Sequence, residues 1–311
     1  MKRVLVTGGS GFVGASLVRR LLRDGHEVHL LVRSGYDPWR IQELLPELFV
    51  HEGDLSDLPS LQETVRRIRG EWVFHLAAHG AYSWQTDTRE IFRTNLFGTI
   101  NLLEACLAAG FESFVNSGSS SEYGFKDHAP SETEWLEPNS DYAVAKASAT
   151  LYCRFAAQKR NVRIATLRLY SIYGPYEHPD RLIPTLLREG LQGRLPPLVN
   201  PDTARDYVYI DDAVEAYLLA AGADLEPGAV FNVGTGVQTP ISEVVEVARR
   251  VLDIHAAPEW SSMAGRSWDT SSWLCDNRKI VRELGWKPRF TLEQGFRETA
   301  KRFPEPRPRS A

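Results

Sequence analysis

Arg3-Val4-Leu5-Val6-Thr7-Gly8-Gly9-Ser10-Gly11-Phe12-Val13-Gly14 is the segment from which the architecture follows. Its first five residues form a short apolar run typical of a buried strand, and the residues after Gly11 repeat apolar side chains at helical spacing. The glycines between them let the backbone approach a ligand closely, while the amino end of the helix offers free N–H groups and a positive dipole. We therefore predict a pyrophosphate-binding turn at the first strand of a dinucleotide-binding sheet.

Tyr142 and Lys146 form a second motif, in the stretch Asp141-Tyr142-Ala143-Val144-Ala145-Lys146. Residues four apart share one helix face, so the lysine ammonium can lie beside the tyrosine hydroxyl and favour the phenolate. An unperturbed phenol titrates near pH ~10, whereas acid/base catalysis at neutral pH needs a pKa closer to the working pH. We expect Tyr142 to transfer a proton and Lys146 to supply part of the required pKa shift.

With both motifs in view, the chain resembles the extended short-chain dehydrogenase/reductase family, in its nucleotide-sugar branch, over nearly its whole length. The family's Gly-x-x-Gly-x-x-Gly loop and Tyr-x-x-x-Lys helix match Gly8, Gly11 and Gly14, then Tyr142 and Lys146. Three further landmarks match in the right order: Gly53-Asp54-Leu55, His75-Leu76-Ala77-Ala78 and Asn95 in Asn-Leu-Phe-Gly-Thr-Ile-Asn-Leu-Leu-Glu.

The resemblance implies an α/β protein with a Rossmann-type doubly wound parallel sheet and a smaller C-terminal α+β substrate lobe. Strands and helices alternate through residue 170, which also indicates parallel strands with ligands at their carboxyl ends. We expect residues 1–170 to form the dinucleotide-binding domain, with a later strand and helix from about 204–235. Residues 171–311 would mostly form the lobe that binds a nucleotide sugar.

The resemblance also implies the site residues. A catalytic serine is expected at the end of the fifth strand, where counting back four from Tyr123-Gly124 selects Ser119, with Ser120 as the alternative because four serines share this run. Substrate contacts would come from Ser119, Ser120 and two arginines that present planar donor forks to phosphate oxygens, Arg205 and Arg266. Cofactor contacts would come from Gly8, Gly11, Phe12, Val13, Gly14, Arg33, Asp54, Leu55, Ala77, Ala78, Tyr142 and Lys146.

The end of the second strand, Val28-His29-Leu30-Leu31-Val32-Arg33-Ser34, bears on the form of the cofactor. An enzyme that uses NAD would normally place an acid there to hold the ribose 2′-hydroxyl. Val32 takes that position and Arg33 follows, and a cation suits the extra phosphate of NADP. Ser34 or Arg40 would add a donor, while Asp37 lies close by. We therefore expect NADP(H), with NAD(H) as the alternative.

Three reactions fit this branch: reduction of a 4-keto sugar, epimerisation at C4, and 4,6-dehydration. The resembled dehydratases carry an Asp-Glu pair directly after the catalytic residue, but this chain has Ser120 and Ser121 there, with Glu122 one place late. A slip of one residue would restore the glutamate. The Gly118 to Gly124 pattern is similar to that of a reductase forming a GDP-deoxyhexose, whereas Tyr173 to Pro184 looks more like the dehydratases. We favour NADP(H)-dependent reduction of a nucleotide-linked 4-keto-6-deoxyhexose, with NAD-dependent 4-epimerisation as the alternative and dehydration third.

The composition limits the partners. The 311 residues are 43% hydrophobic with a net charge of −4, and the absence of a basic run argues against nucleic acid as a partner. No apolar run approaches the roughly 20 residues that span a bilayer, so we expect no membrane partner. Three cysteines without paired or metal-binding spacing suit a reducing cytoplasm, and no metal site is expected.

Two expected helices, roughly 88 to 109 and 141 to 160, carry more apolar and small residues than one core face requires. An ordinary buried core would also account for this surplus. In the resembled family these helices pair across a dimer, so the resemblance implies a homodimer. The residues concerned are Ile91, Leu96, Ile100, Leu103 and Leu107 in one helix, and Ala143, Ala147, Leu151 and Phe155 in the other.

Overall fold

A seven-stranded sheet forms the centre of the molecule in the computed structural model, which describes residues 1–263, 270 and 272–303. All six pairs of neighbouring strands are parallel. The strand order is β10-β6-β5-β4-β1-β2-β3, so the order reverses beside β1, as in a doubly wound sheet. The strands span β1 Arg3–Thr7, β2 Glu27–Val32, β3 Phe49–Glu52, β4 Trp72–His75, β5 Ser113–Ser119, β6 Ile164–Leu169 and β10 Ala229–Val233.

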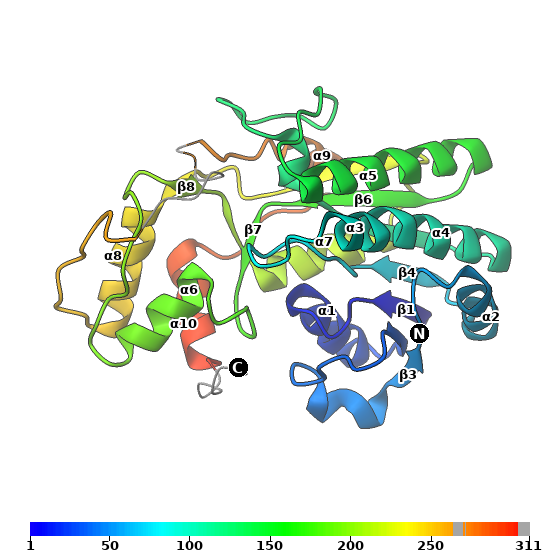
Figure 1. The fold of residues 1–311 in the computed structure, drawn as a ribbon, viewed down its shortest axis with the longest axis horizontal. Helices are drawn as coiled ribbons and strands as arrows, with labels where there is room; N and C mark the ends of the chain where they lie inside the picture. The colour runs from blue at the N-terminus through cyan, green and yellow to red at the C-terminus, as the bar shows by residue number, and fades with distance from the viewer. Residues whose placement is uncertain (264–269, 271, 304–311) are drawn as a thin grey trace.

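Helices cover both faces of the sheet (Figure 1). One face carries α2 (Leu58–Ile68), α4 (Gly98–Ala109) and α5 (Asp141–Arg160), and the other carries α1 (Phe12–Arg23) and α7 (Ile210–Gly222). Two separate apolar clusters lie beneath these layers, one on each face. The predicted α/β Rossmann-type fold is therefore confirmed.

A smaller lobe gathers at one end of the sheet, where α6, α8 and α10 pack together (Figure 1). These helices span α6 Leu182–Gly190, α8 Ile241–Leu252 and α10 Leu292–Lys301, and α9 (Arg278–Leu284) packs on β10 and α7. Two short sheets join the lobes: β7 (Ser171–Tyr173) with β9 (Tyr207–Tyr209), and β8 (Ala204–Arg205) with β11 (Thr239–Pro240).

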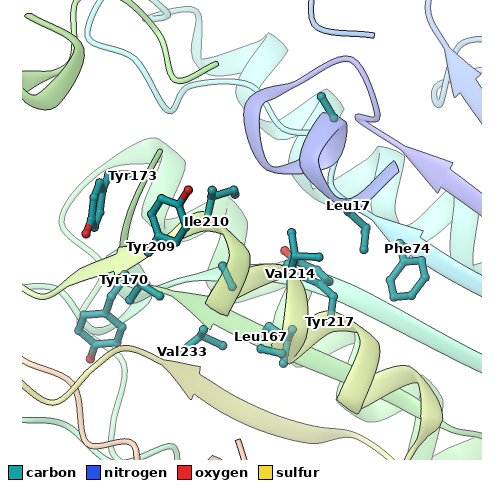
Figure 2. Packing of buried hydrophobic residues seen from close by; sticks show 14 of the residues in the cluster. Leu17, Phe74, Leu167, Tyr170, Tyr173, Tyr209, Ile210, Val214, Tyr217 and Val233 are labelled. Atoms are coloured by element: carbon teal, nitrogen blue, oxygen red, sulfur yellow. The ribbon is translucent and has the colours of Figure 1, made fainter. Parts of the chain in front are cut away.

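One apolar core runs without a break from the sheet into this lobe. Figure 2 shows Leu17 and Phe74 at the sheet end of the cluster, with Tyr173 and Tyr209 at the other end. Val214 and Tyr217 of α7 lie between them. The sheet and the smaller lobe are thus joined by close packing that belongs to both.

The helix expected over 88 to 109 is not a continuous α-helix. It consists of α3 (Thr88–Phe92), a π-helical segment η2 (Arg93–Phe97) and α4. Asn95 is fully buried there, and its amide exchanges hydrogen bonds with the backbone N–H and C=O of His79. The wider π turn accommodates this side chain at the edge of the sheet, a position where such turns often serve a site. The second expected helix matches α5, which Ser140 caps and Asn161 ends in the left-handed region.

Candidate active site

The glycine turn after β1 is packed too closely to admit side chains. Gly8 has φ +69°, and a Cβ on it would lie 2.5 Å from the backbone nitrogen of Ala77. A Cβ on Gly14 would lie 2.1 Å from the carbonyl oxygen of Gly8. Helix α1 begins next to this turn, with Gly11 as its N-cap, no capping side chain among the described residues and no acid in its first turn. The N–H groups and positive dipole of α1 are therefore free to meet a pyrophosphate.

The other predicted cofactor residues follow neighbouring strands at the same edge. Arg33 is exposed directly after β2, and Asp54 is exposed after β3. Hydrogen bonds from the Ser56 backbone and side chain lower the pKa of Asp54. After β4, Ala78 is exposed and the N–H of Ala77 donates to the Thr7 hydroxyl at 3.3 Å. Phe12, Val13 and Leu55 are half-buried beside them. The arrangement fits a dinucleotide lying across the strand ends, and the individual contacts stay predictions.

Arg40, which we expected as an alternative to Ser34 for an extra donor to NADP, makes contacts within the protein. Its Nε donates to the carbonyl oxygen of Tyr176 at 2.8 Å, and its guanidinium lies 4.3 Å from the ring centroid of Trp39. Burial lowers the pKa of Arg40. The Arg19 guanidinium of α1 lies 4.2 Å from the ring centroid of Tyr176. Arg40 thus connects the loop after β2 to the loop after β7. Arg19 connects α1 to the same loop after β7.

Ser119, Tyr142 and Lys146 meet where β5 ends and α5 begins. Ser119 is the last residue of β5, its hydroxyl accepts the Ser121 N–H at 3.1 Å, and its side chain lowers the pKa of Tyr142. Ser140 caps α5 just before Tyr142, and Lys146 lies one turn later with only 3% of its surface exposed. The structure therefore brings the three predicted catalytic residues together, and Ser119 is the serine of this run that acts on the pKa of Tyr142.

Burial sets the protonation of this group. It raises the pKa of Tyr142 to about 12, against the lowering influence of the Ser119 hydrogen bond and of the positive charge on Arg181. Burial also lowers the pKa of Lys146, and the negative charge of Glu122 opposes that change. Ser119 and Arg181 favour the phenolate, and the contribution expected of Lys146 stays a prediction. Desolvation outweighs these influences because the phenol is enclosed.

Ser120 faces a residue that the sequence analysis missed. Its hydroxyl accepts the indole N–H of Trp273 at 3.2 Å. Trp273 and Ser120 also line a small cavity together with Tyr123, Tyr170 and Leu274. Because 153 positions separate the two residues, no local pattern indicated this contact. Trp273 thus lies beside the serine run that follows β5.

Glu122 is not positioned as the acid of a dehydratase. It is fully buried, and its carboxylate accepts the Nε–H of Arg168 at 2.8 Å in an ion pair whose two side chains are almost wholly enclosed. The same carboxylate accepts the backbone N–H of Ser119 at 2.8 Å. The one-residue slip considered above therefore does not return an acid to the substrate side, because Glu122 is paired inside the protein.

Of the two arginines predicted to bind the diphosphate, Arg205 lies among the described residues. Arg205 ends β8, and its Nη1 donates to the carbonyl oxygens of Ala204 at 2.7 Å and Thr270 at 3.4 Å. Its guanidinium lies 5.4 Å from the ring centroid of Trp273, which places it on the cavity side of the second lobe. Arg266 lies outside the described residues.

The part of the chain that the structure describes contains neither a metal-binding cluster nor a membrane-spanning helix. No group of three or more histidine, cysteine, aspartate or glutamate side chains is placed to hold a metal ion there. None of the helices in those residues has the length and apolar character to cross a bilayer.

Comparison with known proteins identifies the class. The chain matches the NAD dependent epimerase/dehydratase family over residues 4–234, and it belongs to that family. This confirms the resemblance to extended short-chain dehydrogenase/reductases, and the protein is an enzyme of that type.

Individual relatives agree over almost the whole chain. UDP-glucose 4-epimerase of Mycolicibacterium smegmatis is 31% identical over 311 residues, covering 97% of this chain and 98% of its own. The structure of UDP-glucose 4-epimerase from Thermotoga maritima with UDP-glucose superposes with a TM-score of 0.87 at 28% identity, covering 96% and 97% of the two chains. MoeE5 in complex with UDP-glucuronic acid and NAD gives a TM-score of 0.83 at 32% identity, with the same coverage.

Proposed function

We propose that this protein is a nucleotide-sugar 4-epimerase that uses a tightly held nicotinamide dinucleotide. The observation that carries the proposal is the meeting of Ser119, at the end of β5, with Tyr142 and buried Lys146 in the first turns of α5, at the strand edge where the glycine turn leaves α1 open to a pyrophosphate. A sugar hydroxyl next to Tyr142 would meet a proton acceptor, and its carbon would face the cofactor. Relatives that carry UDP-glucose or UDP-glucuronic acid support a nucleotide-linked hexose as the substrate.

The enclosed Glu122 favours epimerisation over dehydration. Elimination of water from the sugar needs a further acid and base beside the tyrosine. In this site the residues after Ser119 are Ser120 and Ser121, and the carboxylate of Glu122 forms an ion pair with Arg168. The ketoreductase that we favoured from the sequence is a second candidate, and Val32 followed by exposed Arg33 is the observation that favours it.

The side chains have separate roles in this proposal. Tyr142 takes the proton of the sugar C4 hydroxyl and later returns it, while Ser119 holds the same oxygen by a hydrogen bond. Lys146 contributes its positive charge from one turn beyond Tyr142 on α5. Arg205 holds the diphosphate. A bound nicotinamide would supply the hydride chemistry at C4.

The form of the cofactor follows the choice between the two candidates. An epimerase returns the hydride to its own substrate, so NAD suffices, and the NAD in the MoeE5 complex supports that form. A net reductase consumes NADPH, which Arg33 would favour. The pattern at the end of β2 thus keeps NADP(H) as the competing cofactor.

One assay separates the candidates. The enzyme is incubated with UDP-glucose, UDP-glucuronate, their dTDP counterparts and a 4-keto-6-deoxyhexose nucleotide, with NADH or NADPH added to the last. Sugar stereochemistry is followed by NMR and cofactor by absorbance. We expect conversion at C4 with no net change in absorbance. Stoichiometric loss of NADPH with gain of two hydrogens in the keto sugar would replace the epimerase by the reductase.

We also propose that two copies of the chain pair through α4 and α5. Leu151 and Phe155 on α5 are 57% and 55% exposed, and Phe97 next to α4 is 56% exposed. Ala143 and Ala147, which also lie on α5, are buried within the single chain. The outward apolar side chains of two adjacent helices form a self-complementary face, which supports the homodimer expected from the resemblance.

The cysteines support the expected cytoplasmic location. Cys106, Cys153 and Cys275 are all buried free thiols, and burial raises the pKa of each. Free thiols persist in a reducing compartment.

A further inference from the structure

Glu122 joins the two halves of the candidate active site through one carboxylate. Its Oε1 accepts the backbone N–H of Ser119 at 2.8 Å and the hydroxyl of Thr150 at 3.0 Å. Thr150 lies on α5, one turn beyond Lys146. The serine loop and the tyrosine–lysine helix are therefore both hydrogen-bonded to the same oxygen atom.

The local backbone is shaped to admit this carboxylate. Gly118 precedes Ser119, and a Cβ on it would lie 2.7 Å from Oε1 of Glu122 and 2.8 Å from a methyl group of Thr166. A side chain at position 118 would displace Glu122. The short helix η3 (Ser120–Tyr123) then brings Glu122 back to its own N-cap, Ser119, in a capping box.

Arg168 on β6 fixes the other side of the carboxylate. Its Nε donates to Oε2 of Glu122 at 2.8 Å, and its Nη1 donates to the Tyr123 hydroxyl at 2.7 Å. That hydroxyl in turn donates to Oδ1 of Asn232 on β10 at 2.7 Å. The carboxylate is thus anchored to β6 and, through Tyr123, to β10 of the central sheet. Such a fully satisfied buried network holds its members in one geometry.

The charge of Glu122 also acts on the proton-transfer residues. It raises the pKa of Tyr142, after burial, and it opposes the lowering that burial causes in Lys146. The other ionisable side chains that act on Tyr142 are Arg181, Tyr82 and Tyr217, and His75 and Cys153 adjoin Lys146. Of these groups, Glu122 is the one whose negative charge acts on both Tyr142 and Lys146.

We propose that Glu122 is a positioning residue that fixes Ser119 against Tyr142 and sets the charge balance of the tyrosine–lysine pair. The inference rests on the proposed Ser, Tyr and Lys chemistry. It assigns Glu122 no contact with substrate. In the resembled dehydratases, the acids of this loop act on the sugar. In this protein Glu122 acts only through Ser119, Tyr142 and Lys146.

Two variants separate its geometric role from its electrostatic role. Glu122→Gln removes the charge, whereas Thr150→Val removes one hydrogen bond and keeps the charge. We expect kcat to fall by about 10²-fold in Glu122→Gln, the loss typical of a misplaced catalytic group, with KM changed little. The limb of the pH profile that belongs to Tyr142 should also move to lower pH. Thr150→Val should lower kcat less and leave the pH profile in place.

Two control variants make the same kinds of substitution, carboxylate to amide and threonine to valine, outside the candidate site. Asp212→Asn alters a buried carboxylate paired with Arg289, and Thr299→Val removes a buried hydroxyl that bonds within α10. Both should keep kcat and the pH profile of the wild type. If they lose as much activity as the site variants, or if Glu122→Gln keeps the wild-type kcat and profile, the proposal is overturned. Should Glu122→Gln not fold, an unchanged kcat in Thr150→Val overturns it.

A measurement without substrate keeps this test apart from the proposed function. The Tyr142 phenol is titrated by NMR in protein labelled with ¹³C-tyrosine, with Tyr142→Phe to assign its signal. We expect a lower pKa of Tyr142 in Glu122→Gln than in the wild type, and an unchanged pKa contradicts the proposal. Wild-type protein that converts no nucleotide sugar would contradict the epimerase proposal and leave this titration fully informative.

Discussion

The Tyr142 hydroxyl is the atom on which the proposed proton transfer depends. Tyr142→Phe should keep the fold and cofactor binding, while kcat falls by roughly 10² to 10⁴, the range typical of losing a general acid or base. Tyr152→Phe is the matched control, because Tyr152 lies on the same helix and its hydroxyl donates to Glu104 at 2.7 Å, away from Ser119. Steady-state rates of the two variants decide the matter, and near-wild-type turnover in Tyr142→Phe would show that the site is misplaced.

Substitution of Lys146 should affect more steps of the reaction than substitution of Tyr142. Its ammonium is enclosed beneath the site, and the resemblance gives it a role in holding the nicotinamide ribose. Lys146→Ala should therefore reduce both cofactor affinity and turnover. Calorimetric titration of the cofactor, run beside the rate assay, checks this, and a variant that binds the cofactor as the wild type does would restrict Lys146 to the proton-transfer step.

Arg33 decides between the two forms of the cofactor. If its exposed guanidinium meets a 2′-phosphate, the wild type binds NADPH more tightly than NADH, and Arg33→Ala reduces the difference. Dissociation constants measured by fluorescence titration give the answer. Arg66→Ala on the surface of α2 is the control and should leave the ratio unchanged. Equal constants for both cofactors in the wild type would remove Arg33 from the site.

A buried polar chain links β1, β4 and the π-helical segment. The Thr7 hydroxyl bonds Nδ1 of His75 at 2.7 Å, and Nε2 of His75 bonds the Thr99 hydroxyl at 2.9 Å. Thr99 donates onward to the carbonyl oxygen of Asn95 at 2.7 Å, so its hydroxyl oxygen accepts from Nε2–H of His75. Burial, helped by the charge of Lys146, lowers the pKa of His75 to about 3.

This histidine makes folding sensitive to acid. An unfolded histidine takes up a proton near pH ~6.5, so between that value and pH 3 the unfolded state binds more protons. The free energy of unfolding should therefore fall as the pH drops, by up to about 1.4 kcal/mol per pH unit from His75. Urea unfolding at a series of pH values measures the slope.

Variants isolate the share of His75 in that slope. His75→Gln should be less stable at pH 7 and should show a flatter dependence between pH 6.5 and 4. His255→Gln, in a side chain that is 90% exposed, should keep the wild-type slope. If the slope of His75→Gln equals that of the wild type, the acid sensitivity arises elsewhere.

The assembly of two chains can be tested at the α4–α5 face. A charge within a buried apolar contact is strongly unfavourable, so Leu151→Glu should convert a dimer to a monomer. Leu191→Glu introduces the same change at a side chain that is 65% exposed after α6, and it should leave the dimer intact. Light scattering during size-exclusion chromatography measures the mass. A wild type that elutes as a monomer would contradict the proposed dimer.

Much of the site could be predicted because its residues are close along the chain. Gly8 and Gly14 bracket one turn, and Tyr142 and Lys146 share one helix face, so local geometry alone places each pair. The parallel arrangement of the strands also followed from the alternation of strands and helices. The break in the helix at Asn95 did not follow, because the π turn depends on its bond to His79 in another loop.

The sequence by itself determined the Rossmann-type sheet, the glycine turn and the tyrosine–lysine pair, since short-range spacing and hydrophobic periodicity define them. Only the tertiary structure decided what surrounds them. The ion pair of Glu122 with Arg168 spans 46 positions, and the bond of Arg40 to Tyr176 spans 136. Whether an acid faces the substrate or an arginine in the core depends on how distant strands bring their side chains together, and no local pattern encodes that meeting.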